Sequence, residues 1–251
     1  MIYFVGAGSG APDLITVRGA RLLSEADVIV YAGSLVNPAL LDYKKDGCEV
    51  YNSAKMTLEE VIAVMAPAAK AGKTVGSLHT GDPCVYGAHR EQMDELDRLG
   101  LAYEVCPGVS SFCGAAAALK AEYTLPNVSQ SVILTRMEGR TPVPEKEQIE
   151  SFAAPGATMV IFLSAGQLAR LSERLIAGGY APDTPAAIVY KATWPDEKVV
   201  RTTVADLAEA GAREGITKTA LITVGGFLGT EYERSKLYDP TFTTEFREAS
   251  R

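Results

Sequence analysis

The chain has 251 residues, of which 47% are hydrophobic, so it is long enough for one large or two modest domains with real cores. Its formal net charge is −7 and no block of Lys or Arg interrupts it, which argues against binding to nucleic acid and requires locally placed cations for any anionic substrate. No apolar run approaches the roughly eighteen residues that a membrane span needs, and no basic leader precedes the first strand, so we expect an untargeted cytoplasmic protein with no membrane contact.

Strands and helices are predicted to alternate through the first half of the chain. The first strand, Ile2 to Val5, leads into the glycine-bearing loop VGAGSGAPDLIT, and a helix capped by the Thr16 hydroxyl follows, with Val17, Ala20 and Leu23 on one face. The other strands are predicted at Val28 to Tyr31, Glu49 to Tyr51, Thr74 to Leu78 and Tyr103 to Cys106. This alternation indicates an α/β fold.

The glycine pattern of the first loop raises the question of whether the chain binds a dinucleotide. Gly6, Gly8 and Ala11 match the G-x-G-x-x-G/A pattern of such sites. In a dinucleotide site the helix begins within the glycine run, whereas here Pro12 to Ile15 intervene. The second strand is followed by Ala32, Gly33 and Ser34, not by the acid that binds a ribose. We therefore interpret this loop as a tight turn and reject an NAD site there.

Two further helices have readable ends. Thr57 and Glu60 form a capping box, and Gly72 ends the helix that the box opens. The next helix is expected from about Ala88 to Leu99.

The second half is predicted to form a second domain. Turn residues without periodicity at 123–129 place a boundary between an N-terminal domain at 1–125 and a C-terminal domain at 130–229, with a polar tail at 230–251. The candidate strands are Val132 to Thr135, Met159 to Leu163, Ala187 to Lys191, Val199 to Thr203 and Ala220 to Val224. Only two helices separate them clearly, Gln167 to Ala177 and Val204 to Ala212, so part of this sheet should be antiparallel.

Metal and disulfide chemistry have little support in the sequence. The chain has four cysteines without C-x-x-C spacing and only two histidines, His79 and His89. We expect reduced thiols and no protein-bound metal.

Two more loops follow predicted strands and precede predicted helices. One is LHTGDPCVYG at 78–87, in which Asp82 either accepts a hydrogen bond from a ligand or caps the helix. The other is PGVSS at 107–111, whose hydroxyls are ligand groups or helix caps. With the first loop, they place three glycine-bearing loops at strand ends, which is the usual position of a crevice for a small polar ligand.

In these loops the sequence resembles the tetrapyrrole (corrin/porphyrin) methylases. The resemblance rests on GAGSGAPDLITVRGA, ADVIVYAGSLV, GDPCVYG, PGVSS and TALITVGGF, in one register over residues 1 to 229. The segments LTRMEGRTPVP and ATWPDEKVVRTTVADL are similar to the branch that methylates carbon 11 of precorrin-4. The resemblance implies a two-domain α/β fold with a mostly parallel N-terminal sheet, a homodimer, and S-adenosylmethionine held between the domains with a precorrin-type tetrapyrrole over the N-terminal sheet edge.

The resemblance also implies positions for the cofactor contacts. Matched by motif, they fall on Thr80, Gly81, Asp82, Val85, Ser110, Ser111, Leu163, Ala192, Thr219 and Ala220. Apolar walls with a few hydrogen-bonding groups suit adenosine. Without the resemblance, Leu163 and Ala220 would be interpreted as core residues.

The candidate substrate contacts are a loop serine and the cations that stand in or beside loops. They are Ser9, Arg18, Arg136, Arg140 and Lys191. Taken singly, each of these cations is better explained as a solvated surface charge.

The sequence also departs from the family pattern. Related uroporphyrinogen III methylases carry Tyr-Asp-Arg-Leu-Val after the second strand, where this chain has Tyr31-Ala32-Gly33-Ser34-Leu35-Val36. This argues against uroporphyrinogen III as the substrate and leaves the catalytic residues unknown.

Three alternatives remain open at this stage. One is methylation of another precorrin carbon, of uroporphyrinogen III, or of a different substrate such as a diphthamide intermediate or ribosomal RNA. The others are an NAD-dependent reductase, on the glycine loop alone, and a non-catalytic nucleoside-binding regulator. Residue patterns do not tell whether the substrate contains cobalt.

Overall fold

The structure, a computed structural model, describes residues 1–250 and divides into two compact units. Unit 1 comprises Met1–Gly114 together with Ala192–Asp196, and unit 2 comprises Ala115–Lys191 and the chain from Glu197 onward. The expected domains, 1–125 and 130–229, differ from these units. They stay a prediction, because a division into compact units does not test which segments fold independently. None of the helices within residues 1–250 combines the length and apolar character of a bilayer-spanning helix.

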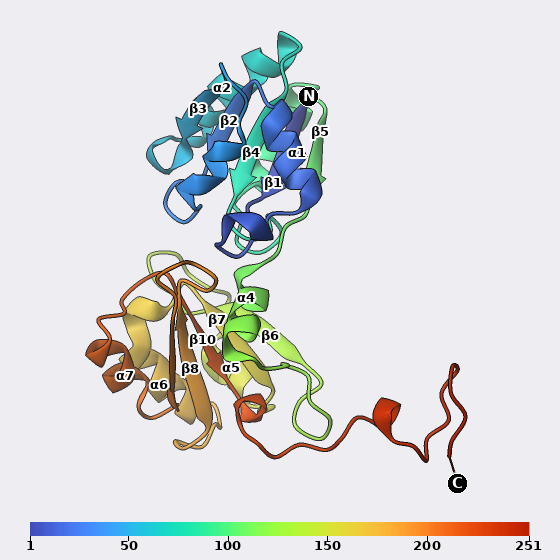
Figure 1. Cartoon of the computed structure of the whole chain (residues 1–251). Coiled ribbons are helices and arrows are strands. Elements are labelled where there is room, and N and C mark those ends of the chain that lie inside the picture. Colours follow the sequence, from blue (N-terminus) through green and yellow to red (C-terminus); the bar gives the residue numbers. More distant parts are fainter. Residues whose placement is uncertain (251) are drawn as a thin grey trace. The chain divides into compact units, whose positions relative to one another are not determined.

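Unit 1 is a five-stranded parallel sheet with helices on both faces (Figure 1). The strand order is β3-β2-β4-β1-β5, with β1 at Ile2–Gly6, β2 at Val28–Tyr31, β3 at Glu49–Asn52, β4 at Val75–His79 and β5 at Tyr103–Cys106. The helices are α1 (Val17–Glu25), α2 (Leu58–Lys70) and α3 (Arg90–Arg98), and α4 (Ser111–Leu119) contains the passage from unit 1 to unit 2.

The alternation of side chains along the central strand builds two cores. Phe4 packs in a cluster with α2 and α3, which includes Met65 and Leu96. Its neighbour Val5 packs on the opposite face in a cluster with Leu23 of α1. Successive residues of a strand point to opposite faces, so one strand serves both layers.

Local capping signals set the helix starts as expected. The Thr16 side chain accepts a hydrogen bond from the Gly19 N–H, and Thr57 and Glu60 form the expected capping box. The predicted buried face of α1 was wrong at Val17, which is 90% exposed. Val17 occupies the first position of α1, and the buried face of this helix runs through Gly19, Leu22 and Leu23.

Unit 2 is a mixed five-stranded sheet of order β6-β7-β10-β8-β9. Its elements are β6 (Val132–Arg136), α5 (Ile149–Ala153), β7 (Thr158–Phe162), α6 (Leu168–Ala177), β8 (Pro185–Tyr190), β9 (Lys198–Thr203), α7 (Leu207–Arg213) and β10 (Ala220–Val224). Strands β6 and β7 are parallel, whereas β10 is antiparallel to β7 and β8, and β8 is antiparallel to β9. The predicted antiparallel part is therefore confirmed, and α5 is an element that periodicity missed because it has only five residues.

The topology brings specific loops to one edge of each sheet. In unit 1 the carboxyl ends of β1, β4 and β5 meet at one edge. In unit 2 the carboxyl ends of β6, β7 and β8 share an edge with the amino end of β10, because β10 runs in the opposite direction. The loops predicted to carry function leave from these two edges.

Candidate functional site

The first glycine loop is held by the loop that follows β4. Gly8 and Gly81 form a two-way backbone bridge, with the Gly8 N–H donating to Gly81 O at 3.2 Å and the Gly81 N–H donating to Gly8 O at 3.1 Å. A 3-10 turn at Pro12–Leu14 separates these glycines from α1. The α1 N-terminus is therefore not part of the glycine run, and the geometry differs from a dinucleotide cradle.

Two glycines allow the strand ends of unit 1 to approach each other closely. A Cβ on Gly6 would lie 2.5 Å from Gly108 Cα, and a Cβ on Gly108 would lie 2.2 Å from Gly81 O. No side chain fits in either place, so the three loops meet backbone to backbone.

His79, the last residue of β4, holds the loop at 80–87. Its ring is 6% exposed and contacts the Gly87 carbonyl through Nδ1 at 2.9 Å and the Ser77 hydroxyl through Nε2 at 3.0 Å. Because a carbonyl only accepts, Nδ1 carries the proton and Nε2 accepts from Ser77. Burial lowers the pKa of His79 from 6.5 to about 4, so the ring is neutral at physiological pH.

Asp82 joins two of the three loops. One carboxylate oxygen accepts from the Cys84 N–H at 2.8 Å and the other from the Gly108 N–H at 2.8 Å. Burial raises the pKa of Asp82, but these hydrogen bonds outweigh it and the net pKa lies below the ordinary value. Asp82 is therefore an ionised clip between the β4 and β5 loops, and its oxygens retain lone pairs for a ligand.

Hydroxyl groups at the same edge have no internal partner. Thr80 is half-buried and Ser110 is buried, and neither hydroxyl makes a hydrogen bond with any residue in the range 1–250. Ser111 begins α4, and Val85 is half-buried in the β4 loop. Unpaired hydroxyls beside apolar groups can bind the ribose and base of a nucleoside.

The segment after β8 packs onto the first loop within unit 1. Thr193 Oγ1 lies 3.2 Å from the Ser9 hydroxyl and accepts from the Ala11 N–H at 2.9 Å. A Cβ on Gly10 would lie 2.2 Å from a Trp194 ring carbon. Ser9, predicted as a substrate contact, thus has its hydroxyl beside Thr193, a neighbour that spacing along the chain could not reveal.

The edge of unit 2 where β6, β7 and β8 end carries residues with left-handed backbone conformation. Leu163 (φ 53°), Lys191 (φ 46°) and Thr219 (φ 55°) all stand where strands end or begin at this edge. The Lys191 N–H donates to Thr219 O at 2.9 Å. Leu163 follows the buried strand β7 and is nevertheless 62% exposed. Non-glycine residues in this conformation are strained and cluster at binding sites, as do exposed large apolar groups.

Ala192 and Ala220, the other two expected cofactor contacts, lie close to these residues along the chain. Ala192 is buried and is grouped with unit 1, whereas half-buried Ala220 pairs with Tyr190 across the sheet of unit 2. The Lys191 ammonium lies 5.4 Å from the centre of the Tyr190 ring.

The candidate cations have different surroundings. Arg136 donates to the carbonyls of Met137, Thr141 and Pro142, so that it organises its own loop. Arg140 and Arg18 are exposed. Residues 1–250 hold no cluster of three or more His, Cys, Asp or Glu side chains suited to a metal ion, and the four cysteines are free thiols.

The family model of the tetrapyrrole (corrin/porphyrin) methylases matches residues 1–208. A cobalt-precorrin-4 C(11)-methyltransferase of Methanocaldococcus jannaschii is 54% identical over 249 residues, covering 99% of this chain and 96% of the relative. A precorrin-4 C(11)-methyltransferase of a Sinorhizobium species is 45% identical over 248 residues, covering 98% of each chain.

Solved structures agree with these relatives. The structure of a cobalt precorrin-4 methyltransferase, a cobalamin biosynthetic enzyme, superposes with a TM-score of 0.89 and 49% identity over 91% of this chain and 96% of that one. A uroporphyrin III C-methyltransferase of Thermus thermophilus, solved with S-adenosyl homocysteine, has a TM-score of 0.76 and 28% identity over 90% of this chain and 92% of that one. The chain belongs to the tetrapyrrole (corrin/porphyrin) methylases.

Proposed function

We propose that the protein transfers a methyl group from S-adenosylmethionine to carbon 11 of precorrin-4 or cobalt-precorrin-4. The observation that carries this function is the 54% identity over 99% of the chain to a cobalt-precorrin-4 C(11)-methyltransferase. The loop geometry agrees, because each sheet presents glycine-bearing or strained loops at one edge and no dinucleotide cradle is formed.

The cofactor supplies an electrophilic methyl group whose leaving group departs neutral, so the transfer needs little acid catalysis. The protein's part is to align a nucleophilic ring carbon with that methyl group and to exclude water. The close-packed backbones of Gly6, Gly81 and Gly108 provide a rigid floor for this alignment, because no side chain there can change rotamer.

Proton removal from the substrate requires only a weak base or water. His79 does not serve this purpose, because both ring nitrogens are engaged and the ring is buried. Asp82 is committed to two backbone N–H groups. The general base therefore stays unassigned.

The cofactor contacts in this proposal are the ten residues named from the family motifs. In unit 1 the unpaired hydroxyls of Thr80 and Ser110 support it, and in unit 2 the exposed side chain of Leu163 does. Leu163→Ala should weaken S-adenosyl homocysteine binding about tenfold, since roughly half of a buried leucine's transfer free energy is lost. The matched control is Ile176→Ala, which removes another partly exposed aliphatic side chain, on α6. Equal affinities of the two variants by titration calorimetry would remove Leu163 from the site.

The cellular compartment and the oligomeric state of the protein belong to the same proposal. We place the enzyme in the cytoplasm as a homodimer, with no membrane or nucleic-acid partner, on the family resemblance and on the absence of a basic block in the sequence. Sedimentation equilibrium measures the dimer, and a monomer at micromolar concentration would contradict it.

The deciding experiment offers the protein precorrin-4, cobalt-precorrin-4 and uroporphyrinogen III in turn, with methyl-labelled S-adenosylmethionine. We expect label at carbon 11 by NMR with one or both precorrin-4 forms, and the faster of the two identifies the natural acceptor. Label at another ring carbon would show a different branch of the family. If the protein binds S-adenosyl homocysteine but methylates none of the three acceptors, a non-catalytic regulator is favoured. A rise in thermal stability with NADH would favour the NAD-dependent reductase.

A further inference from the structure

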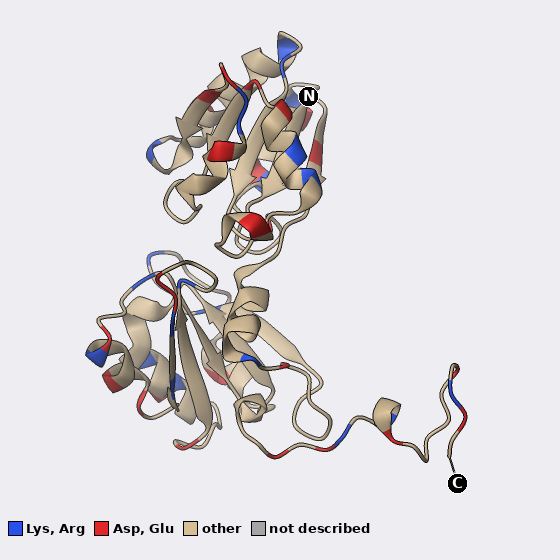
Figure 2. Cartoon of the chain, viewed as in Figure 1, with Lys and Arg blue, Asp and Glu red and all other residues tan. Residues whose placement is uncertain are grey.

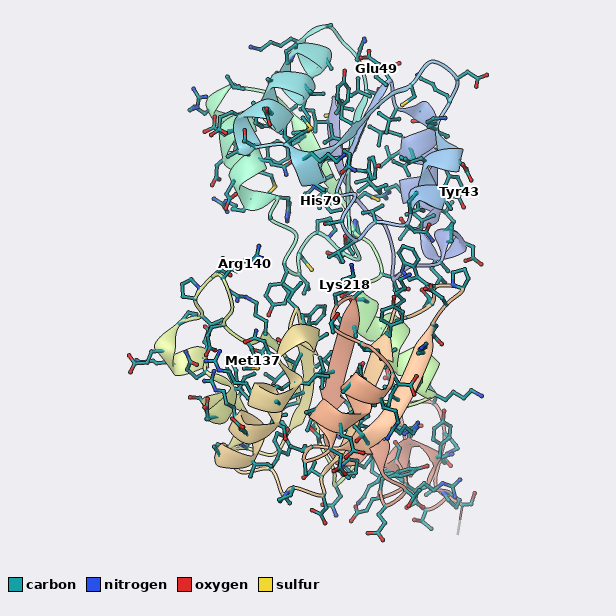
Figure 3. All side chains as sticks on the ribbon, turned by 90° about the vertical axis from the view of Figure 1, so that its left-hand side faces the viewer. Tyr43, Glu49, His79, Met137, Arg140 and Lys218 are labelled. Atoms are coloured by element: carbon teal, nitrogen blue, oxygen red, sulfur yellow. The ribbon has the colours of Figure 1, made fainter. Side chains whose placement is uncertain are left out.

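The loop between β6 and α5 is built as a rigid support. Met137 is buried in the core of unit 2, and its N–H donates at 2.9 Å to the Ser164 hydroxyl. That hydroxyl donates in turn to Phe162 O at 2.7 Å, which ties the loop to the end of β7. Figure 3 labels Met137 in unit 2 and Arg140 further along the same loop.

Glu138 clamps the same loop to α6. One oxygen of its carboxylate accepts from both Arg170 and Arg174, and its backbone carbonyl accepts from the Gln167 side chain at 3.2 Å. Arg174 also donates to Glu150 at 2.6 Å through Nε. The hydrogen bond from Arg174 lowers the pKa of Glu138 and outweighs the raising effect of burial, so the clamp is charged at neutral pH.

The clamp leaves Arg140 as a cation without a counterion. The nearest carboxylate along the chain, that of Glu138, is taken by α6. Arg140 is exposed and makes no hydrogen bond or ion pair with any residue of the described chain, 1–250. A guanidinium held on a rigid loop loses little entropy when it binds a carboxylate.

A second cation stands on a neighbouring loop of the same edge. Lys218 immediately precedes Thr219 and β10, is exposed, and also has no hydrogen-bond or ion-pair partner within residues 1–250. The loops touch in succession, because a Cβ on Gly139 would lie 3.6 Å from Gln167 Nε2 and a Cβ on Gly166 would lie 3.2 Å from Thr217 O. Basic segments on loops at this end of unit 2 are blue in Figure 2, although the whole chain has a net charge of −7.

We propose that Arg140 and Lys218 bind carboxylate groups on the rim of the tetrapyrrole, and that Glu138 is the positioning residue that holds the Arg140 loop for this contact. The inference rests on the proposed function for the identity of the substrate. Leu163, which the proposed function assigns to the cofactor, lies between these two loops in the order of the strands, so the two cations stand on either side of a proposed cofactor contact. Two unpaired cations on the cofactor's edge match a macrocycle that is anionic at its rim and must approach the methyl donor.

The test measures binding and turnover separately in Arg140→Ala, Lys218→Ala and Glu138→Ala. Arg140→Ala and Lys218→Ala should each raise KM for the precorrin about tenfold or more, as expected for a lost hydrogen bond between charged groups, with S-adenosyl homocysteine affinity unchanged. Arg140→Lys should recover part of the loss, because it retains the charge and loses the bidentate fork. Glu138→Ala should also raise KM for the precorrin. When it is added to Arg140→Ala, it should cause little further increase in KM.

The matched control is Lys70→Ala, which makes the same charge change at the C-terminal end of α2, beside the opposite edge of the unit 1 sheet. It should leave KM unchanged. Rising ionic strength should weaken wild-type binding more than binding by the Arg140→Ala/Lys218→Ala double variant, a difference that a merely structural role would not produce.

Direct titration with uroporphyrin III, a stable macrocycle with a carboxylate rim, separates this inference from the proposed function. Wild-type binding that both variants weaken supports the inference even if carbon 11 is not methylated, a result that would overturn only the function. Unchanged uroporphyrin affinity and unchanged KM in the double variant would overturn the inference while leaving the methyltransferase intact.

Discussion

The buried histidine at the end of β4 predicts a pH-dependent stability between pH 7 and pH 5. Burial lowers the pKa of His79 from 6.5 to about 4, so in this interval the unfolded chain binds a proton that the folded chain does not. The stability that the neutral His79 ring contributes is therefore present above pH 6.5 and is lost as the pH falls toward 4. The full difference corresponds to about 3 kcal/mol, of which about 2 kcal/mol is lost between pH 7 and pH 5.

The assay is urea unfolding at pH 7, 6 and 5 for the wild type, His79→Asn and a His89→Asn control. The free energy of unfolding of His79→Asn should be lower at pH 7, because the Gly87 and Ser77 contacts are disturbed, but it should lose about 2 kcal/mol less than the wild type on going to pH 5. His89→Asn retains the buried His79 ring and removes only the smallest of the effects on its pKa, so it should keep most of the wild-type pH dependence. Parallel pH profiles for the wild type and His79→Asn would refute the reasoning.

Three further outcomes follow from the geometry. Asp82→Asn should lower the free energy of unfolding by about 1.5–3 kcal/mol, because an amide cannot accept from both Cys84 and Gly108 through charged oxygens. If titration calorimetry of the folded variant also shows weaker S-adenosyl homocysteine binding, Asp82 contacts the ligand as well, whereas unchanged affinity would mean that its role is purely structural. Gly6→Ala should destabilise by about 1–3 kcal/mol or prevent folding in thermal unfolding, since its Cβ would meet Gly108, and wild-type stability would show that the loops are not packed this closely. Ala32→Asp should not confer methylation of uroporphyrinogen III in a labelled-methyl assay, because acceptor choice depends on the alignment of the whole macrocycle with the methyl group, and detectable transfer would locate that choice in one side chain.

Much of the framework was predictable because its causes are local. The Thr16 cap and the Thr57–Glu60 capping box involve residues three apart, and the strand-forming runs of β2 and β5 end where turn residues begin. Strand-forming runs separated by helical patterns then specify an α/β fold. The family was recognisable for a similar reason, because the glycine loops are contiguous stretches whose residue order is itself the signal.

The contacts that organise the candidate site join residues far apart in the chain. Ser9 meets Thr193, and Asp82 meets the Gly108 N–H, at separations that no periodicity encodes. The exposure of Leu163 depends on a left-handed turn after β7, whereas its apolar side chain after a buried strand favoured the core.

The sequence by itself determined which segments become strands and helices, where helices begin, and that glycine loops follow strands, because these depend on neighbouring residues and on the period of apolar side chains. Tertiary structure alone decided that the clamp of Glu138 leaves Arg140 without a counterion, and that Lys218 joins it at the same edge. The physical reason is that a charge becomes a binding group or a structural one according to which partners the fold brings within hydrogen-bonding distance, and those partners come from other strands and helices.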